Sequence, residues 1–213
     1  MNKEEFLIEV EKLGVKLSEK QKNQLDEFYQ ILVEENSKIN LTRITSLEDV
    51  YLKHFYDSLT LIKEVNLSND LTLCDVGSGA GFPGIVLKIV FPNLKVTLVD
   101  SLQKRVNYLN KTINKLELKN INAIHIRAED YKDKFDIVTS RAVANLEKLI
   151  NYCMHLVDEN GKFVAMKANI SKELDIDDKI FEKNRCKITK INEFLLPKEE
   201  SKRSLVVIEK LKS

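Results

Sequence analysis

Glycine is concentrated in one short segment of this chain. Four of the six glycines lie in the segment Gly77-Ser-Gly-Ala-Gly-Phe-Pro-Gly84. A short apolar run, residues 71–76, precedes this segment, and residues 84–91 have the apolar spacing of a helix that ends at Pro92. Glycine tolerates positive φ and lets a ligand approach the main chain. The pattern therefore predicts a strand, a ligand-binding loop and a helix in succession.

The rest of the chain continues this alternation. We expect further strands at residues 94–99, 121–126, 135–139, 162–166, 188–195 and 204–208, and helices at residues 102–117 and 145–157. Alternating strands and helices with short connections predict an α/β fold on a mostly parallel sheet. Before this region, apolar residues recur at helical spacing, and Ser18 with Gln21 forms a capping box. We therefore predict an N-terminal helical extension, residues 1–66, and a Rossmann-like domain, residues 67–213.

Charge and composition narrow the class of protein. The 34 basic and 33 acidic side chains give a net charge of +1, which excludes a globally basic protein but allows a local basic face. The N-terminal segment is charged and no apolar run approaches the ~20 residues of a membrane span. Cysteines and histidines are few and dispersed, so neither a disulfide framework nor a metal site is expected. We expect a monomeric, cytoplasmic protein with no membrane partner.

The glycine segment is compatible with two cofactors. Residues 79–84 match G-x-G-x-x-G, and Asp100 follows at about the 20-residue distance seen in dinucleotide-binding proteins. However, Asp75 stands just before Gly77, at the end of the expected strand, where its carboxylate would repel a pyrophosphate at the next helix. S-adenosylmethionine carries an amino group and a sulfonium instead of phosphates. The loop therefore favours S-adenosylmethionine, bound by Asp75, Gly77, Gly79 and Gly81, and leaves NAD as the alternative.

Polar residues that follow the next strands complete this predicted site. Asp100 can accept hydrogen bonds from two ribose hydroxyls, or alternatively cap the next helix. Ala128 and Glu129, after the third strand, can recognise an adenine amine through backbone groups or a carboxylate. Arg141, after the fourth strand, can hold the target base, a phosphate or the cofactor carboxylate, and is our candidate catalytic residue. A surface salt bridge is its alternative role.

Two motifs that the chain lacks reduce the number of possible classes of methyl acceptor. The sequence Thr139-Ser-Arg-Ala142 follows the fourth strand in place of the Pro-Pro turn often used for exocyclic amines, and no Pro-Cys pair supplies a nucleophile for pyrimidine carbon. A ring nitrogen such as guanine N7 needs only orientation. Basic residues are predicted to contact RNA phosphates, with a solvated surface as the alternative: Lys104, Arg105, Lys167, Lys202 and Arg203.

Several segments together resemble one known family. They are Asn40-Leu-Thr42, His54-Phe-Tyr-Asp-Ser58, Asp75–Gly84, Leu98-Val-Asp-Ser-Leu-Gln-Lys-Arg105, Ala128-Glu129, Ser140-Arg-Ala142 and Leu205-Val-Val-Ile208. Over roughly residues 20–210 the chain resembles the RsmG (GidB) family of small-subunit rRNA guanine-N7 methyltransferases. Two features depart from the family's usual pattern: the chain has no tryptophan, and Ala168 follows Lys167 where glycine is frequent.

The resemblance implies a class I S-adenosylmethionine-dependent methyltransferase fold with seven strands. It implies a guanine of 16S rRNA as substrate, presented as naked rRNA, a 30S subunit or an assembly intermediate. By the same resemblance, Gly77, Phe82, Ala128, Glu129 and Arg141 lie at the cofactor, Asp100 lies at its ribose, and the RNA-facing cleft is flanked by His54, Asp57, Ser58, Lys202 and Arg203. The alternatives are another RNA or small-molecule methyltransferase, a non-catalytic RNA-binding module and an NAD-dependent reductase.

Overall fold

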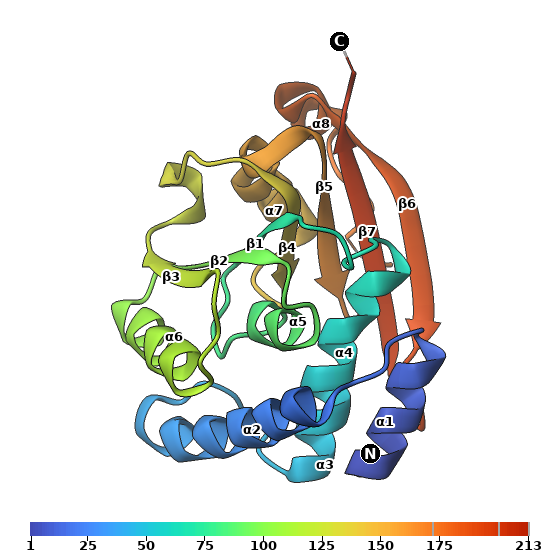
Figure 1. Ribbon diagram of the computed structural model, residues 1–213. Helices are drawn as coiled ribbons and strands as arrows, with labels where there is room; N and C mark the ends of the chain where they lie inside the picture. The colour runs from blue at the N-terminus through green and yellow to red at the C-terminus, as the bar shows by residue number, and fades with distance from the viewer. Residues whose placement is uncertain (172, 200, 213) are drawn as a thin grey trace.

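A seven-stranded sheet organises the computed structural model, which describes residues 1–213 except 172, 200 and 213. Its strands are β1 (Thr72–Val76), β2 (Lys95–Asp100), β3 (Ile121–His125), β4 (Phe135–Arg141), β5 (Val157–Lys167), β6 (Cys186–Leu195) and β7 (Lys202–Lys210). Their order is β3-β2-β1-β4-β5-β7-β6. The first five strands are parallel, whereas β7 runs antiparallel to β5 and β6. This confirms the predicted fold class, and Figure 1 shows the β6–β7 hairpin at one side of the sheet.

Helices cover both faces of the sheet. One apolar cluster contains residues of α5 (Gly84–Val90) and α6 (Gln103–Lys115), and the other contains residues of α7 (Leu146–Cys153) together with partly buried side chains of α8 (Asp178–Asn184). Short 3₁₀ turns η3 (Ala128–Asp130) and η4 (Met154–Leu156) complete this part of the chain. Both faces of the central strands are therefore buried, which accounts for their nearly continuous apolar sequences.

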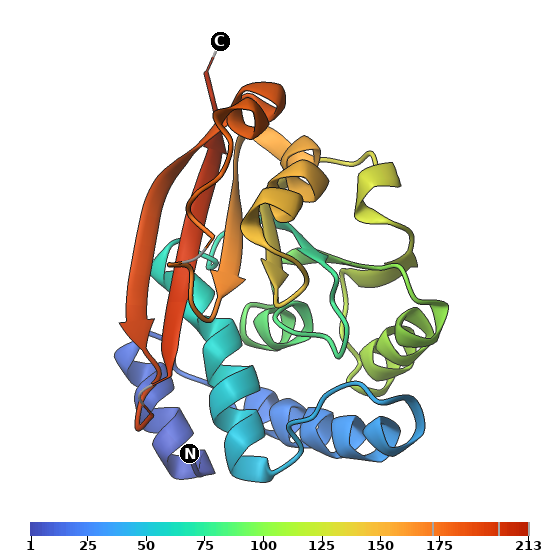
Figure 2. The same ribbon diagram turned by 180° about the vertical axis from the view of Figure 1, so that it is seen from behind.

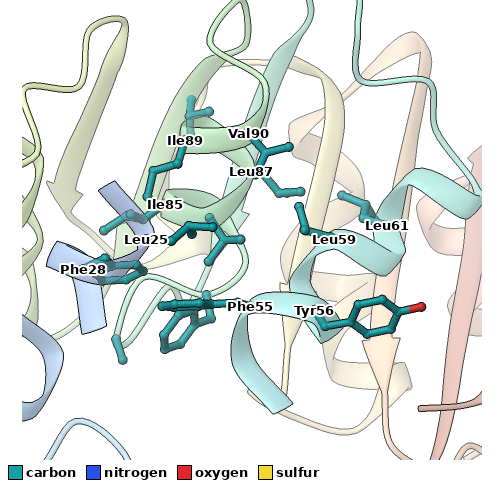
Figure 3. Packing of buried hydrophobic residues seen from close by; sticks show 14 of the residues in the cluster. Leu25, Phe28, Phe55, Tyr56, Leu59, Leu61, Ile85, Leu87, Ile89 and Val90 are labelled. Carbon is teal, nitrogen blue, oxygen red and sulfur yellow. The ribbon is translucent and has the colours of Figure 1, made fainter. Parts of the chain in front are cut away.

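The predicted N-terminal extension is helical and packs beneath the sheet (Figure 2). It comprises α1 (Lys3–Lys12), α2 (Glu19–Ile39), α3 (Leu47–Val50), the π-helical turn η1 (Tyr51–Tyr56), α4 (Asp57–Leu59) and η2 (Thr60–Lys63). The capping box of Ser18 and Gln21 is present at the start of α2. Figure 3 shows Phe28 of α2 and Phe55 of η1 against Ile85 of α5, and the two phenyl rings stack at 5.7 Å. The extension thus shares its core with the sheet, and the boundary between residues 66 and 67 stays a prediction.

Two elements differ from the sequence predictions. Strand β5 begins at Val157 instead of residue 162, because the polar stretch 158–160 belongs to the strand despite its exposure. Helix α8 is absent from those predictions, and none of its residues is fully buried, so its sequence has no strong apolar periodicity. Among the described residues, no helix has the length and apolar character needed to cross a membrane.

Candidate active site

A cavity of about 550 Å³ opens at the carboxyl ends of the parallel strands. Such an edge is where open α/β sheets bind ligands, and the volume lies in the usual range for small-molecule sites. Its walls come from the loop after β1, the end of β2, residues 126–129 after β3 and residues 141–143 after β4. The helical extension adds Leu41, Thr42 and His54. The sheet topology therefore gathers segments that are far apart in the sequence.

The glycine loop is shaped by main-chain requirements. Gly77 and Gly79 line the cavity with φ of 72° and 56°, in the left-handed region. A Cβ on Gly77 would collide with the side chain of Val143, whereas a Cβ on Gly79 would have Gly77 O, at 3.8 Å, as its nearest neighbour. Any side chain at Gly79 would therefore occupy space that the cavity leaves for a ligand.

Asp75 and Gly81, predicted to bind the cofactor, lie behind the loop instead of on the cavity wall. Asp75 is fully buried; its Oδ2 accepts a hydrogen bond from Gly84 N at 3.0 Å, and its Oδ1 has no hydrogen-bond partner among the described residues. Burial raises the pKa of this carboxyl to about 7. A Cβ on Gly81 would lie 2.6 Å from Ile85 Cδ1, so this glycine permits close packing. Asp75 and Gly81 therefore support the glycine loop on the side that faces away from the cavity.

The bond between Asp75 and Gly84 also discriminates between the two cofactors. In dinucleotide-binding folds, the pyrophosphate sits on the free N–H groups at the start of the helix that follows the glycine loop. Here the first residue of α5, Gly84, already donates its N–H to a buried carboxyl group. This arrangement disfavours a phosphate anion at that position.

Asp100 joins the glycine loop to the segment that leads into α6. Its Oδ1 accepts from Leu102 N, the residue before the first turn of α6, and its Oδ2 accepts from Gly79 N, both at 2.9 Å. It also lines the cavity, and each carboxylate oxygen can accept more than one hydrogen bond. Ala128 and Glu129 line the same cavity, as predicted from their position after β3.

A stacked wall closes the cavity beside the helical extension. The imidazole of His54 lies parallel to the ring of Phe82, with centroids 4.3 Å apart, and Arg141 lies over the same phenyl ring at 5.2 Å. Arg141 Nη2 is 3.1 Å from His54 Nδ1. Nδ1 also lies 3.2 Å from Lys53 O, so it faces both a donor and an acceptor, and Nε2 lies 3.0 Å from Thr42 Oγ1. Burial and the charge of Arg141 lower the pKa of His54 to about 3, so the ring is neutral.

Arg141 belongs to a largely buried ionic group, not to a surface salt bridge, since its side chain is 13% exposed. Its Nη1 donates to Lys53 O at 2.9 Å and to Asp57 Oδ2 at 3.3 Å. On the other side of Asp57, Arg203 Nε donates to both carboxylate oxygens, at 3.1 and 3.0 Å. Burial lowers the pKa of Arg141, and the charge of Asp57 opposes that shift. Ser58 is fully buried and donates to His54 O, so Asp57 and Ser58 hold the wall in place.

A second cavity of about 380 Å³ adjoins the first. It shares His54, Arg141 and Ala142 with the first cavity and is otherwise lined by Ile44, Lys53, Asp57, Met166, Lys167, Ala168, Asn169, Glu173 and Arg203. Ala142 has a φ of 56°, which is strained for a residue with a Cβ. The two cavities are thus separated by a thin partition formed by the three described residues that line both, His54, Ala142 and the candidate catalytic residue Arg141.

Comparison with known proteins identifies the family. Residues 21–206 match the GidB family, described as rRNA small subunit methyltransferase G. The chain belongs to this family. Proteins named ribosomal RNA small subunit methyltransferase G are similar over nearly the whole chain: that of Oceanobacillus iheyensis is 46% identical over 99% of this chain and 91% of its own, and that of Bacillus subtilis is 46% identical over 100% and 92%. The GidB assignment predicted from the motifs is confirmed.

Solved structures support the fold of this GidB protein independently. A ribosomal protein L11 methylase from Lactobacillus delbrueckii subsp. bulgaricus has a TM-score of 0.57 at 16% identity, covering 75% of this chain and 79% of its own. A SAM dependent methyltransferase from Aquifex aeolicus has a TM-score of 0.56 at 19% identity, covering 76% and 93%. At these identities the similarity concerns the fold, which is the predicted methyltransferase fold.

Of the predicted RNA contacts, Ser58 is fully buried and lines neither cavity, so its side chain is not exposed to RNA. The basic residues predicted to contact RNA are distributed over three places. Arg105 lines the first cavity, beside Asp100, and Lys167 and Arg203 line the second. Lys104 and Lys202 are exposed and line neither cavity. Sequence reasoning missed Tyr152 on the first cavity and Glu173 on the second, because each lies in a segment without a recognisable motif.

Proposed function

We propose that this protein transfers the methyl group of S-adenosylmethionine to N7 of a guanine in 16S rRNA. The family match over residues 21–206 is the observation that carries the proposal. The cavity supports the choice of cofactor, because a buried carboxyl group occupies the helix terminus that a dinucleotide's pyrophosphate would need. The proposal is also supported by the lining of the cavity, which includes Gly77, Gly79, Phe82, Asp100, Ala128, Glu129 and Arg141.

The residues on this wall fit the chemical groups of the cofactor. Asp100 would accept hydrogen bonds from the ribose hydroxyls while keeping its bonds to the glycine loop, and Ala128 with Glu129 would lie beside the adenine. The bound cofactor supplies an electrophilic methyl group on a positively charged sulfur. As the carbon–sulfur bond breaks and the carbon–nitrogen bond forms, the positive charge passes to the base and a neutral thioether remains.

The protein's own part in this reaction is binding and orientation. Guanine N7 carries no proton at neutral pH, so the reaction needs no general base. This agrees with His54, whose two ring nitrogens are engaged by Arg141 and Thr42. Arg141, fixed by Lys53 and Asp57 at the partition, is placed to donate a hydrogen bond to the base and to exclude water from the point of transfer.

The decisive experiment supplies methyl-labelled S-adenosylmethionine to rRNA, 30S subunits and immature particles from a strain that lacks this protein. We expect label at one guanine N7 of 16S rRNA, mapped by cleavage at 7-methylguanine. A small-molecule methyltransferase would leave the rRNA unlabelled, and a non-catalytic module would bind it, with a steep dependence on salt, without transfer. Calorimetry with NADH and with S-adenosylmethionine tests the reductase alternative, because a reductase would bind NADH and a methyltransferase would bind S-adenosylmethionine.

The form of the substrate and the assembly state belong to the same proposal. We propose that the protein acts as a monomer in the cytoplasm on 16S rRNA, presented as naked rRNA, a 30S subunit or an assembly intermediate. Parallel assays on naked rRNA, purified 30S subunits and immature particles would rank the substrates. Sedimentation equilibrium of the protein alone would show a mass other than 24.6 kDa if it forms oligomers.

A further inference from the structure

The partition between the two cavities sets where the methyl acceptor must lie. Among the residues that the structure describes, only His54, Arg141 and Ala142 line both cavities. Methyl transfer requires donor carbon and acceptor nitrogen about 3–3.5 Å apart and in line. If the donor occupies the cavity on the glycine loop, an acceptor ring in the second cavity can meet it at this partition. The strained φ of Ala142 fits a position at which the main chain is held close to reacting groups.

The second cavity has the chemistry of a base-binding pocket. Ile44, Ala142 and Met166 offer apolar surface to the faces of an aromatic ring, and the polar groups are charged side chains at its sides. Enzymes that modify a base within RNA or DNA take it out of the stack and read its Watson–Crick edge with hydrogen bonds. A guanine carries acceptors, N7 and O6, on one edge. Its N1–H and 2-amino donors lie on another edge and require an acceptor from the protein.

The cavity contains two carboxylates, and the structure distinguishes their roles. Both oxygens of Asp57 accept hydrogen bonds from Arg203, and one also accepts from Arg141. Glu173 uses only Oε2, which accepts from Leu146 N at 2.7 Å and lies 2.8 Å from Lys167 Nζ. Within the part of the chain that the structure describes, Glu173 Oε1 has no such contact. Glu173 is therefore the carboxylate available to a ligand.

We propose that the second cavity receives the extruded guanine and that Glu173 accepts hydrogen bonds from its N1–H and 2-amino group. This inference rests on the proposed function. With N7 directed at the partition, the adjacent O6 meets the donors of Arg141. Adenine would present an amino group to Arg141 and has no N1–H for Glu173, so both contacts select guanine.

The test is a cycle of two proteins and two substrates. The wild type and Glu173→Ala are each assayed on a 16S rRNA fragment that carries either guanosine or inosine at the mapped position, because inosine lacks only the 2-amino group. We expect inosine to lower kcat/KM of the wild type about 10-fold, as for loss of a hydrogen bond to a charged group. On guanosine, kcat/KM of Glu173→Ala should be at least about 10-fold lower than that of the wild type. Replacing guanosine by inosine should not lower kcat/KM of this variant any further. An equal inosine penalty in both proteins would overturn the assignment.

Matched variants separate recognition from the contact of Glu173 with α7. Glu173→Gln keeps an oxygen for Leu146 N but removes the negative charge beside Lys167, so it should lower the melting temperature less than Glu173→Ala does while losing discrimination between the two bases. Glu147→Ala removes an acidic residue from the first turn of the same helix, away from the cavity, and should retain the full inosine penalty. Loss of the penalty in Glu147→Ala would contradict a specific role for Glu173.

A binding measurement keeps this inference distinct from the proposed function. Absence of methyl transfer by the wild type would refute the function, whereas GMP and IMP can be titrated into the protein with S-adenosylhomocysteine and without turnover. We expect GMP to bind more tightly than IMP to the wild type and equally to Glu173→Ala. Equal affinities of GMP and IMP for the wild type would overturn the role of Glu173.

Discussion

The two adjoining cavities are built in different ways. Most of the first is made of short segments that directly follow strands of the sheet, and its glycine loop is shaped by main-chain conformation. The second is made of side chains from the helical extension, β5, the segment after it and β7, and its charges are paired with one another. By the proposed function, a cofactor shared by many enzymes would bind to the common architecture of the fold, whereas the acceptor side would depend on contacts particular to this chain.

The strongest test of the first cavity is Gly79→Val. The side chain would enter the space left for the ligand, so we expect affinity for S-adenosylmethionine to fall about 100-fold or more, equivalent to about 2.8 kcal/mol. Gly14→Val is the matched control, because Gly14 also has positive φ, lies outside the cavity, and leaves open space within 4 Å of the point that a Cβ would occupy. Both variants should lose similar stability, about 1–2 kcal/mol. Normal binding by Gly79→Val, measured by calorimetry, would refute the loop assignment.

Arg141→Ala tests the partition itself. We expect methylation to fall about 100-fold, the effect of misplacing a reacting group by about 1 Å. Arg141→Lys should rescue little, because an ammonium cannot bridge Lys53 O, Asp57 and His54 at once. The measurement is single-turnover methylation normalised to folded protein. A lower melting temperature with full activity in the folded fraction would make Arg141 a purely structural residue.

Asp57→Asn should separate the two cavities. The change leaves the guanidinium groups of Arg141 and Arg203 buried without a counter-charge, which we expect to cost about 3 kcal/mol of unfolding free energy. The free energy of S-adenosylmethionine binding should fall by a smaller amount in the folded fraction, since Asp57 does not line the first cavity and acts on it only through Arg141. Urea unfolding and calorimetry below the transition measure the two effects. Equal losses of unfolding free energy and of binding free energy for S-adenosylmethionine would show that the cavities are not independent.

The buried imidazole of His54 predicts a specific dependence of stability on pH. Its pKa is about 3 in the folded protein and ~6.5 in the unfolded chain, so only the unfolded chain binds a proton between these values. The stabilisation is fully present above pH ~6.5 and is lost as the pH falls toward 3, by up to about 1.4 kcal/mol per pH unit. The difference between wild type and His54→Gln in urea unfolding should follow this profile. A difference that does not change over that range would contradict the neutral, buried state.

The smallest expected effect concerns the strained residue in the partition. Ala142→Gly relieves a positive φ and should raise the unfolding free energy by about 1 kcal/mol. Glu117→Gly is the control, because Glu117 has a φ of 53° and lies just after α6, outside both cavities. Both variants should gain stability, but only Ala142→Gly should lose methylation rate, because glycine also allows the partition to adopt other main-chain conformations. Full activity in Ala142→Gly would show that the main-chain geometry of Ala142 is not needed.

The contrast between the cavities also explains what the sequence could predict. The fold followed from the alternation of apolar segments, and the residues at the first cavity followed from their positions after strands, as for Asp100 and Ala128. Asp75 lies at the end of β1 as predicted but points behind the loop, because the spacing of motifs does not determine on which side of a loop a side chain is buried. The pairing of Asp57 with Arg203 joins residues 146 positions apart and leaves no periodic signature.

The position of Arg203 on β7 has a consequence for biosynthesis. A polypeptide emerging from the ribosome can form β1, its glycine loop and β2 long before residue 203 has been translated. Until the β6–β7 hairpin has been added, Asp57 lacks the bidentate partner that helps it to anchor Arg141. We therefore expect nascent chains to form the binding site for the methyl donor first, and to become able to modify RNA only when translation is nearly finished.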